Sequence, residues 1–223
     1  VAAGKAAWQM ARAARACLQD NFCGGVVVTK YGHVKGEIAD VACFEGGHPV
    51  PDENSLRGTD AALALTEDLT ESDTVVFLLS GGGSALFEKP LLPLAELQDV
   101  TNQLLAAGAD IVEINTIRKR LSAVKGGRFA RHCAPAQVFA VVLSDILGDP
   151  LDMIASGPAY PDSSSCAQAL DLAQRYGLRL SAREQLGPRD HIGEAEIVLD
   201  PVGLSERAVI LVQHMNVKTS RTA

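Results

Sequence analysis

Residues 74–84 read Thr-Val-Val-Phe-Leu-Leu-Ser-Gly-Gly-Gly-Ser, an apolar run that passes directly into three glycines between two serines. A strand with apolar side chains on both faces is typical of a parallel sheet covered by helices on both sides. Successive glycines can adopt backbone conformations that other residues avoid, so their N–H groups can converge on one anion. We therefore predict a buried strand that ends in a phosphate-binding turn; a turn without a ligand is the alternative.

Strand and helix patterns alternate on both sides of this segment. Further strands are predicted at residues 1–3, 25–30, 41–44, 138–143 and 208–212. Helices are predicted at residues 6–19, from Asn54 or Ser55 as the cap to residue 69, at 93–107, at 110–122, near Phe129 and at 164–176. This alternation predicts an α/β fold, a Rossmann-like three-layer sandwich with a largely parallel sheet.

Composition excludes several classes of partner. The 223 residues are 47% hydrophobic and 21% charged with a net charge of -7, so no overall positive field attracts nucleic acid or an anionic membrane. No apolar run approaches the roughly 20 residues that cross a bilayer. The five cysteines are scattered and lack metal-ligand spacing, which favours reduced thiols. We expect a cytoplasmic protein with no nucleic-acid or membrane partner.

Ligands of parallel α/β sheets bind outside the carboxyl ends of the strands. Three turns follow predicted strands: Gly4-Lys5, residues 80–84 and residues 144–149. Lys5 heads a predicted helix, where a lysine opposes the helix dipole, and an anionic ligand would compensate for this. The glycine turn is neither a Walker A motif nor GxGxxG, so neither a P-loop NTPase nor an ordinary dinucleotide fold is indicated.

A site that binds phosphate groups also needs cations against them. Arg118, Lys119, Lys125 and Arg128 form one cluster in the sequence, although such a cluster is more often a solvated helix face.

The turn after residue 143 carries closely spaced carboxylates. Asp145, Asp149 and Asp152 suit Mg²⁺ held together with phosphate oxygens, and they equally suit the capping of turns and helices. His48 lies in a proline-rich loop that serves as a substrate lid or, as we favour, as a rigid turn.

Taken together, these segments resemble the glycerate 2-kinase family. The matching blocks follow the family's order over roughly residues 1–162 and are Gly4-Lys5-Ala6-Ala7, Gly47-His48-Pro49-Val50-Pro51-Asp52, Leu79-Ser80-Gly81-Gly82-Gly83-Ser84-Ala85-Leu86, Asn115-Thr116-Ile117-Arg118-Lys119-Arg120-Leu121-Ser122, Lys125-Gly126-Gly127, Leu143-Ser144-Asp145, and Gly148-Asp149 through Ser156-Gly157-Pro158.

The resemblance implies ATP-dependent, Mg²⁺-assisted phosphorylation of D-glycerate at its 2-hydroxyl. It implies catalytic roles for Lys5, Arg118 and Asp145, and metal binding by Asp145 and Asp149. The residues implied to bind ATP or its phosphates are Ser80, Gly81, Gly82, Gly83, Ser84, Asn115 and Lys119.

The resemblance also implies how the chain is organised. Residues 1–185 match the family's N-terminal α/β domain without its first segment, residues 186–223 form a divergent tail, and the C-terminal MOFRL domain has no counterpart. We therefore expect this chain alone to have little kinase activity. The sequence is also compatible with a homodimer. Two alternatives stay open: an NAD(P)H-dependent hydroxypyruvate reductase and a non-catalytic phosphosugar-binding module.

Overall fold

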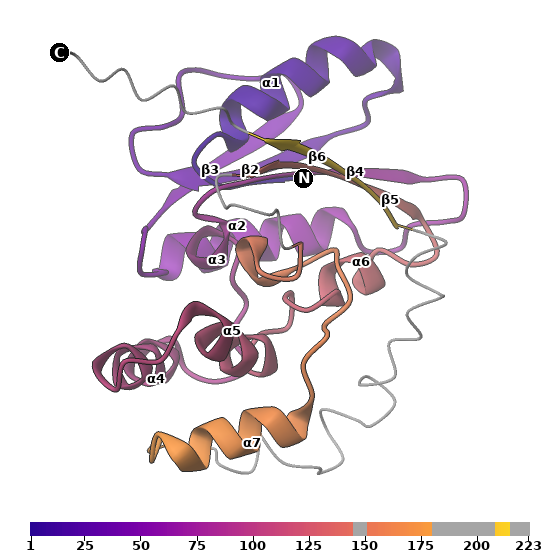
Figure 1. The fold of residues 1–223 in the computed structure, drawn as a ribbon. Coiled ribbons are helices and arrows are strands. Elements are labelled where there is room, and N and C mark those ends of the chain that lie inside the picture. Colours follow the sequence, from indigo (N-terminus) through magenta and orange to yellow (C-terminus); the bar gives the residue numbers. More distant parts are fainter. Residues whose placement is uncertain (145–150, 180–207, 215–223) are drawn as a thin grey trace, which may run out of the picture.

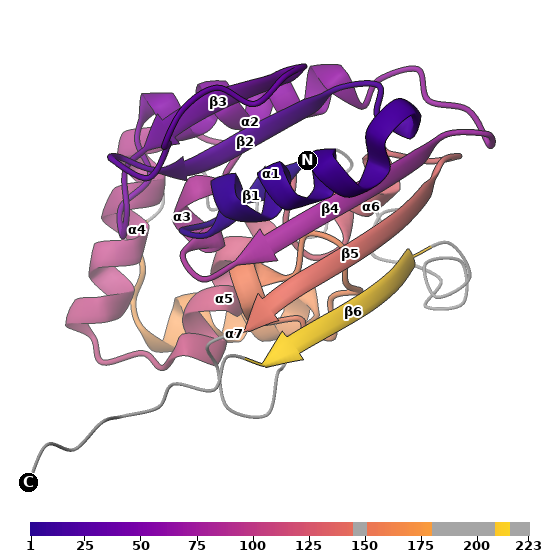
Figure 2. The same cartoon turned by 90° about the horizontal axis from the view of Figure 1, so that it is seen from above.

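The computed structural model describes residues 1–144 and 151–179, together with the backbone of residues 208–214. Within these residues the chain forms one sheet of six strands in the order β3-β2-β1-β4-β5-β6 (Figure 1). All strand pairs are parallel, and the arrowheads of Figure 2 point the same way. The strands are β1 Ala2–Ala3, β2 Gly25–Lys30, β3 Val41–Gly46, β4 Thr74–Ser80, β5 Gln137–Ser144 and β6 Ala208–His214. The order is that of a doubly wound Rossmann sheet, which confirms the predicted fold class.

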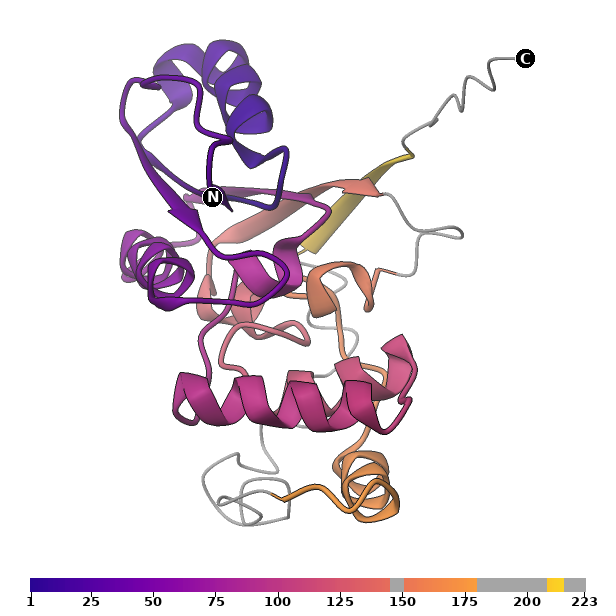
Figure 3. The same ribbon diagram turned by 90° about the vertical axis from the view of Figure 1, so that its left-hand side faces the viewer.

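Helices cover both faces of the sheet. Helix α1 lies on one face, and α2, α3 and α6 lie on the other (Figure 1). A further layer of α4, α5 and α7 lies beyond α2, α3 and α6, on the side of the molecule away from α1 (Figure 3). The helices are α1 Ala7–Leu18, α2 Glu53–Leu65, α3 Gly83–Leu86, α4 Leu94–Ala106, α5 Ile111–Arg120, α6 Arg128–His132 and α7 Cys166–Arg175, with short 3₁₀ turns η1 Gln19–Asn21 and η2 Ile154–Ser156.

Helix α2 begins earlier than predicted. Its cap is Asp52, whose carboxylate accepts the backbone N–H of Ser55 at 2.9 Å, while the Ser55 hydroxyl accepts the Asp52 N–H at 3.4 Å. The prediction that Asn54 or Ser55 caps this helix was therefore wrong. Asp52 holds the extended backbone that a cap requires, and Ser55 serves as the third helical residue of a capping box.

The main core lies between the sheet and the helices α2, α3 and α6. Phe77, Phe87 and Phe129 are fully buried there, with ring centroids 4.8–5.4 Å apart. A separate apolar cluster joins α4, α5 and α7. None of the helices in the described part of the chain is long and apolar enough to span a membrane.

The sheet places the predicted ligand turns side by side. Strand β1 is central and pairs with both β2 and β4, so that Ala3 lies opposite Val28 on one side and Leu79 on the other. The turns after β1 and β4 therefore meet at the point where the strand order reverses, which is where doubly wound sheets bind ligands.

Candidate functional site

The turns after β1 and β4 form a single hydrogen-bonded unit. The Lys5 N–H donates to the Gly81 carbonyl at 2.9 Å, and the Ala6 N–H donates to the Ser80 hydroxyl at 3.0 Å. Gly4 permits this contact because its φ is +116° and a Cβ there would lie 2.4 Å from the Ser80 carbonyl oxygen. The Ser80 hydroxyl thus holds the Lys5 turn against the glycine turn.

Lys5 and His48 both approach Gly82. At Gly82, whose φ is +90°, a Cβ would lie 2.9 Å from Cδ2 of His48 and 3.3 Å from Cγ of Lys5. Partial burial lowers the pKa of His48, and the neighbouring charges of Lys5, Lys30 and His33 lower it further. This end of the glycine turn therefore combines a cationic surrounding with a backbone that has no side chain, which suits an anion.

The other end of the turn is held by buried charges. The Ser84 carbonyl accepts hydrogen bonds from Nη2 of Arg118 and Nζ of Lys125, both at 2.9 Å. Oε2 of Glu88 lies 3.2 Å from Arg118 and 3.4 Å from Lys125. Lys125 and Glu88 are fully buried and Arg118 is 8% exposed. Burial lowers the pKa of Lys125 to about 8, against the opposing effect of Glu88.

The interpretation of this basic cluster as a solvated helix face was therefore wrong. Three of its four cations are buried because the interior offers them partners: Glu88 and backbone carbonyls for Arg118 and Lys125, and two aspartates for Lys119. The fourth, Arg128, donates to the carbonyls of Ser122 and Lys119 and fastens the segment after α5.

Asn115 reaches the glycine turn through Ser156, for which the sequence predicted no individual role. The Ser156 hydroxyl donates to Oδ1 of Asn115 at 2.8 Å and lies 3.3 Å from the Ser84 hydroxyl. Ser156 and Ala155 have φ values of 62° and 52°, a left-handed conformation that is strained for residues other than glycine. The surrounding structure holds this strain where Asn115 and Ser84 meet.

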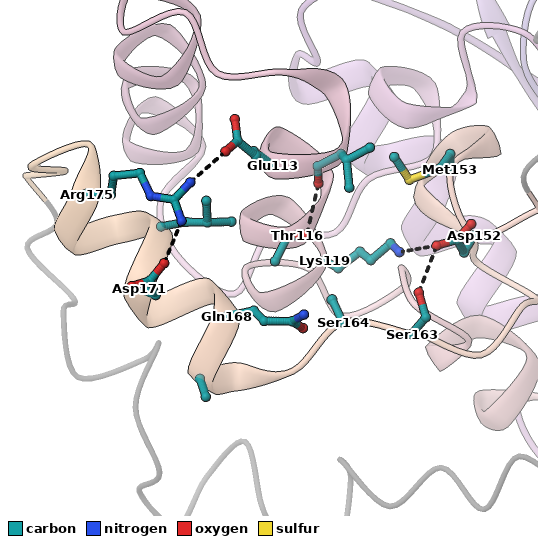
Figure 4. A pocket seen from close by; sticks show the side chains of 13 residues that line it. Glu113, Thr116, Lys119, Asp152, Met153, Ser163, Ser164, Gln168, Asp171 and Arg175 are labelled. Carbon is teal, nitrogen blue, oxygen red and sulfur yellow. Dashed lines mark hydrogen bonds and ion pairs between the residues drawn. The ribbon is translucent and has the colours of Figure 1, made fainter.

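Lys119 faces a cavity of about 520 Å³ between α5 and α7 (Figure 4). Its ammonium lies 3.2 Å from Asp162 and 3.5 Å from Asp152, and the residue is only 2% exposed. Asp162 also pairs with Arg120 at 3.0 Å. Burial alone would raise the pKa of Asp162, but hydrogen bonds from Ser164 and the two cations lower it.

The structure thus brings most of the predicted site together. Lys5, residues 80–84, Arg118 and Asn115 lie around one edge of the sheet, and Lys119 lies along the same face of α5 as Asn115, four residues further on. Asp145 and Asp149 fall outside the described residues, so their metal-binding role stays a prediction. Residues 1–144 and 151–179 contain no group of three or more His, Cys, Asp or Glu arranged to hold a metal ion.

Two residues of the site, Glu88 and Ser156, were given no role by the sequence, although Ser156 belongs to one of the blocks that carry the family resemblance. Glu88 stands 30 positions before its partner Arg118, and Ser156 stands 41 positions after Asn115, so no local pattern connects them. Because Glu88 follows Leu86-Phe87 but is followed directly by Lys89, its local sequence is that of an ordinary surface carboxylate and gave no signal of burial.

Comparison with known proteins identifies the relatives of the chain. A family model described as "Domain of unknown function (DUF4147)" matches residues 1–187. A D-glycerate 2-kinase of Thermotoga maritima is 58% identical over 183 residues, which are 81% of this chain and 44% of that protein. A putative hydroxypyruvate reductase of Agrobacterium vitis is 43% identical over 190 residues, 83% of this chain and 43% of that protein.

A solved structure shows the same fold. The crystal structure of a glycerate kinase from Thermotoga maritima superposes with a TM-score of 0.81 at 51% identity, covering 92% of this chain and 53% of that one. The chain spans less than half the length of the curated relatives named above. The chain therefore belongs to the DUF4147 family, whose domain forms the N-terminal part of glycerate 2-kinases.

Proposed function

We propose that the protein is a cytoplasmic kinase that transfers the terminal phosphoryl group of ATP to the 2-hydroxyl of D-glycerate. The observation that supports this most is the union of the Lys5 turn with the glycine turn, beside His48, at the point where the strand order reverses. The names of the relatives point to the same reaction. Phosphoryl transfer depends mainly on positioning and on neutralising charge, which is what cations around a glycine turn provide.

The residues present fit a phosphate group. A Cβ at Gly82 would collide with the His48 ring and crowd Lys5, so the glycine is what lets both basic groups pack against the turn. Lys5 would neutralise the transferring phosphoryl group, and Arg118 would act from the Ser84 end of the turn, where it already bonds the backbone. The uncharged amide of Asn115 would contact substrate or phosphate.

The acceptor and the metal involve the turn after β5. In this proposal Asp145 orients the 2-hydroxyl of D-glycerate, and Asp145 and Asp149 hold Mg²⁺; both residues lie outside the described part. Mg²⁺, when bound, would neutralise phosphate oxygens during transfer.

The reductase alternative has weaker support. Some relatives are called putative hydroxypyruvate reductases. A dinucleotide-binding Rossmann fold, however, uses a GxGxxG turn after its first strand. Here that turn is Gly4-Lys5-Ala6-Ala7, and it is closed by bonds to Ser80 and Gly81. The glycine-rich segment follows β4 instead.

The first test is a coupled assay of ADP release with D-glycerate and Mg·ATP, run beside NADH oxidation by hydroxypyruvate. We expect ADP release by this chain alone to be low; whatever glycerate-dependent release it supports should fall by about 100- to 1000-fold in Lys5→Ala, the usual cost of removing one group that stabilises developing charge. Lys35→Ala is the matched control, because Lys35 is exposed and bonds only the Gly32 carbonyl in the described structure. Its activity should stay at the wild-type level.

Binding separates the remaining outcomes. Calorimetric titration with inorganic phosphate should give saturable binding that Lys5→Ala weakens and Lys35→Ala does not. Phosphate binding without turnover by the 223-residue chain would support the site and assign catalysis to a longer protein. NADH oxidation without ADP release, or no phosphate binding by folded protein, would overturn the proposal.

A further inference from the structure

The cavity between α5 and α7 has the size of a small-molecule site. Its volume of about 520 Å³ lies within the range of pockets that enclose drug-sized ligands. Figure 4 shows Thr116 and Lys119 entering it from α5, Gln168 from α7, and Met153 and Ser163 from the intervening segment. The function proposed above does not account for it.

The charges of the cavity do not favour an anion. Arg175 lies 3.1 Å from Glu113 and 2.8 Å from Asp171, and Lys119 pairs with Asp152 at 3.5 Å. Both cations of the lining are therefore already opposed by carboxylates. A triphosphate or the carboxylate of glycerate would find no uncompensated positive charge here.

The remaining lining suits an uncharged, flat and partly polar ligand. Apolar surface comes from Val112, Met153, Ala167 and Leu172, and uncharged polar groups come from Thr116, Ser163, Ser164 and Gln168. Between the ion pairs the wall therefore alternates apolar surface with hydroxyl and amide groups, a combination that can hold the ring and the hydroxyls of a nucleoside.

A short chain of contacts connects the cavity to the glycine turn. The sulfur of Met153, in the cavity wall, lies 3.8 Å from Nδ2 of Asn115. Asn115 bonds Ser156 at 2.8 Å, and Ser156 lies 3.3 Å from Ser84. Asn115 and Ser156 are buried, so these contacts form the wall between the cavity and the turn, and they make the Ser84 end the part of the turn that lies nearest to the cavity.

We propose that the α5–α7 cavity binds the nucleoside portion of the phosphoryl donor. The acceptor then approaches from the Lys5–His48 end, so that donor and acceptor meet across the glycine turn. This assignment rests on the proposed kinase function and extends it, because it states which end of the turn serves which substrate.

Ala167→Phe tests the cavity. Ala167 lines it from an exposed face of α7, so a ring there obstructs the cavity without entering the core. Gln174→Phe is the matched control, because Gln174 is also exposed on α7 and does not line the cavity. Adenosine, ADP and inorganic phosphate are the probes, titrated calorimetrically, with KM for ATP and for D-glycerate measured in parallel.

The expected result is specific. Ala167→Phe should weaken binding of adenosine and ADP by about tenfold or more and raise the KM for ATP similarly. Phosphate binding and the KM for D-glycerate should change less than about twofold, and Gln174→Phe should behave like wild type.

Other outcomes overturn the assignment in distinguishable ways. If ADP binding and ATP-dependent turnover survive in Ala167→Phe but are lost in Lys5→Ala, the kinase function stands and the nucleoside lies elsewhere. A rise in the KM for D-glycerate alone would place the acceptor in the cavity. Absence of both ADP binding and phosphate binding from folded wild-type protein would remove the kinase function and this assignment together.

Discussion

At the scale of single residues, the site depends on one buried acid. Glu88 is fully buried and faces two cations, Arg118 and Lys125, both of which donate hydrogen bonds to the Ser84 carbonyl. Removing one partner of a buried ionic group leaves an uncompensated charge, which costs much more than the pair contributed. Glu88 therefore stabilises the cations that hold the end of the glycine turn.

Glu88→Gln should destabilise the protein by about 3–5 kcal/mol, because two buried cations then lack their carboxylate. Asp60→Asn is the control: it breaks an ion pair with Lys89 of 2.6 Å whose side chains are both about half exposed, and such pairs contribute less than about 1 kcal/mol. Urea unfolding of both variants measures the difference. Equal losses would show that the buried charges are not coupled as described.

The loss of folding stability caused by Glu88→Gln, called the deficit below, should also depend on pH. The pKa of Lys125 is lowered to about 8 by burial and raised by Glu88, so the variant lowers it further. Between that lower value and about pH 8 the folded variant binds fewer protons than the folded wild type, and its stability rises faster with pH. The deficit should be largest below this window and smaller at pH 8; a constant deficit from pH 6 to 8 would contradict the coupling.

At the scale of elements, the glycine turn leaves no space for a side chain at Gly82. Gly82→Ala combines a φ of +90° with a Cβ 2.9 Å from the His48 ring. Gly32→Ala is the matched control, since Gly32 has a φ of +77° and open space around the Cβ position. Both substitutions should cost about 1 kcal/mol of backbone strain.

Only Gly82→Ala should also impair the site, because His48 or Lys5 must move away from the turn. We expect phosphate affinity and glycerate-dependent ADP release to fall by about tenfold or more in Gly82→Ala and to stay near wild type in Gly32→Ala. Thermal unfolding checks the shared strain, and calorimetry with phosphate checks the difference. Similar phosphate affinities in the two variants would show that the Gly82 turn does not contact the anion.

The same elements show which features of the fold could be predicted from the sequence and which could not. Strands with continuous apolar runs, such as β2 and β4, were predicted almost to the residue because burial on both faces leaves a direct pattern. The inward direction of Arg118 and Lys125 was not predictable, because their partner Glu88 belongs to a distant segment and becomes a neighbour only on folding. The left-handed backbone at Ala155 likewise has no signature in its residue type.

At the scale of the whole molecule, the described part contains apolar cores of two kinds. One packs helices onto the sheet and includes Phe77 and Leu86, and another joins α4, α5 and α7 and includes Leu104. Between them lies a polar seam formed by Glu88, Arg118, Lys125, Asn115 and Ser156. A polar contact between two apolar units couples their unfolding less tightly than a continuous core does.

Leu104→Ala and Leu86→Ala form a matched pair, since both leucines are fully buried and each substitution should cost about 2–5 kcal/mol at its own core. In native-state hydrogen exchange, Leu104→Ala should reduce protection of α4, α5 and α7 while the amides of β4 and β5 lose much less. Leu86→Ala should reduce protection in both regions, because the helical layer rests on the sheet. If Leu104→Ala reduced protection equally in β5 and α5, the polar seam would couple the unfolding of the two apolar cores as tightly as a continuous core does.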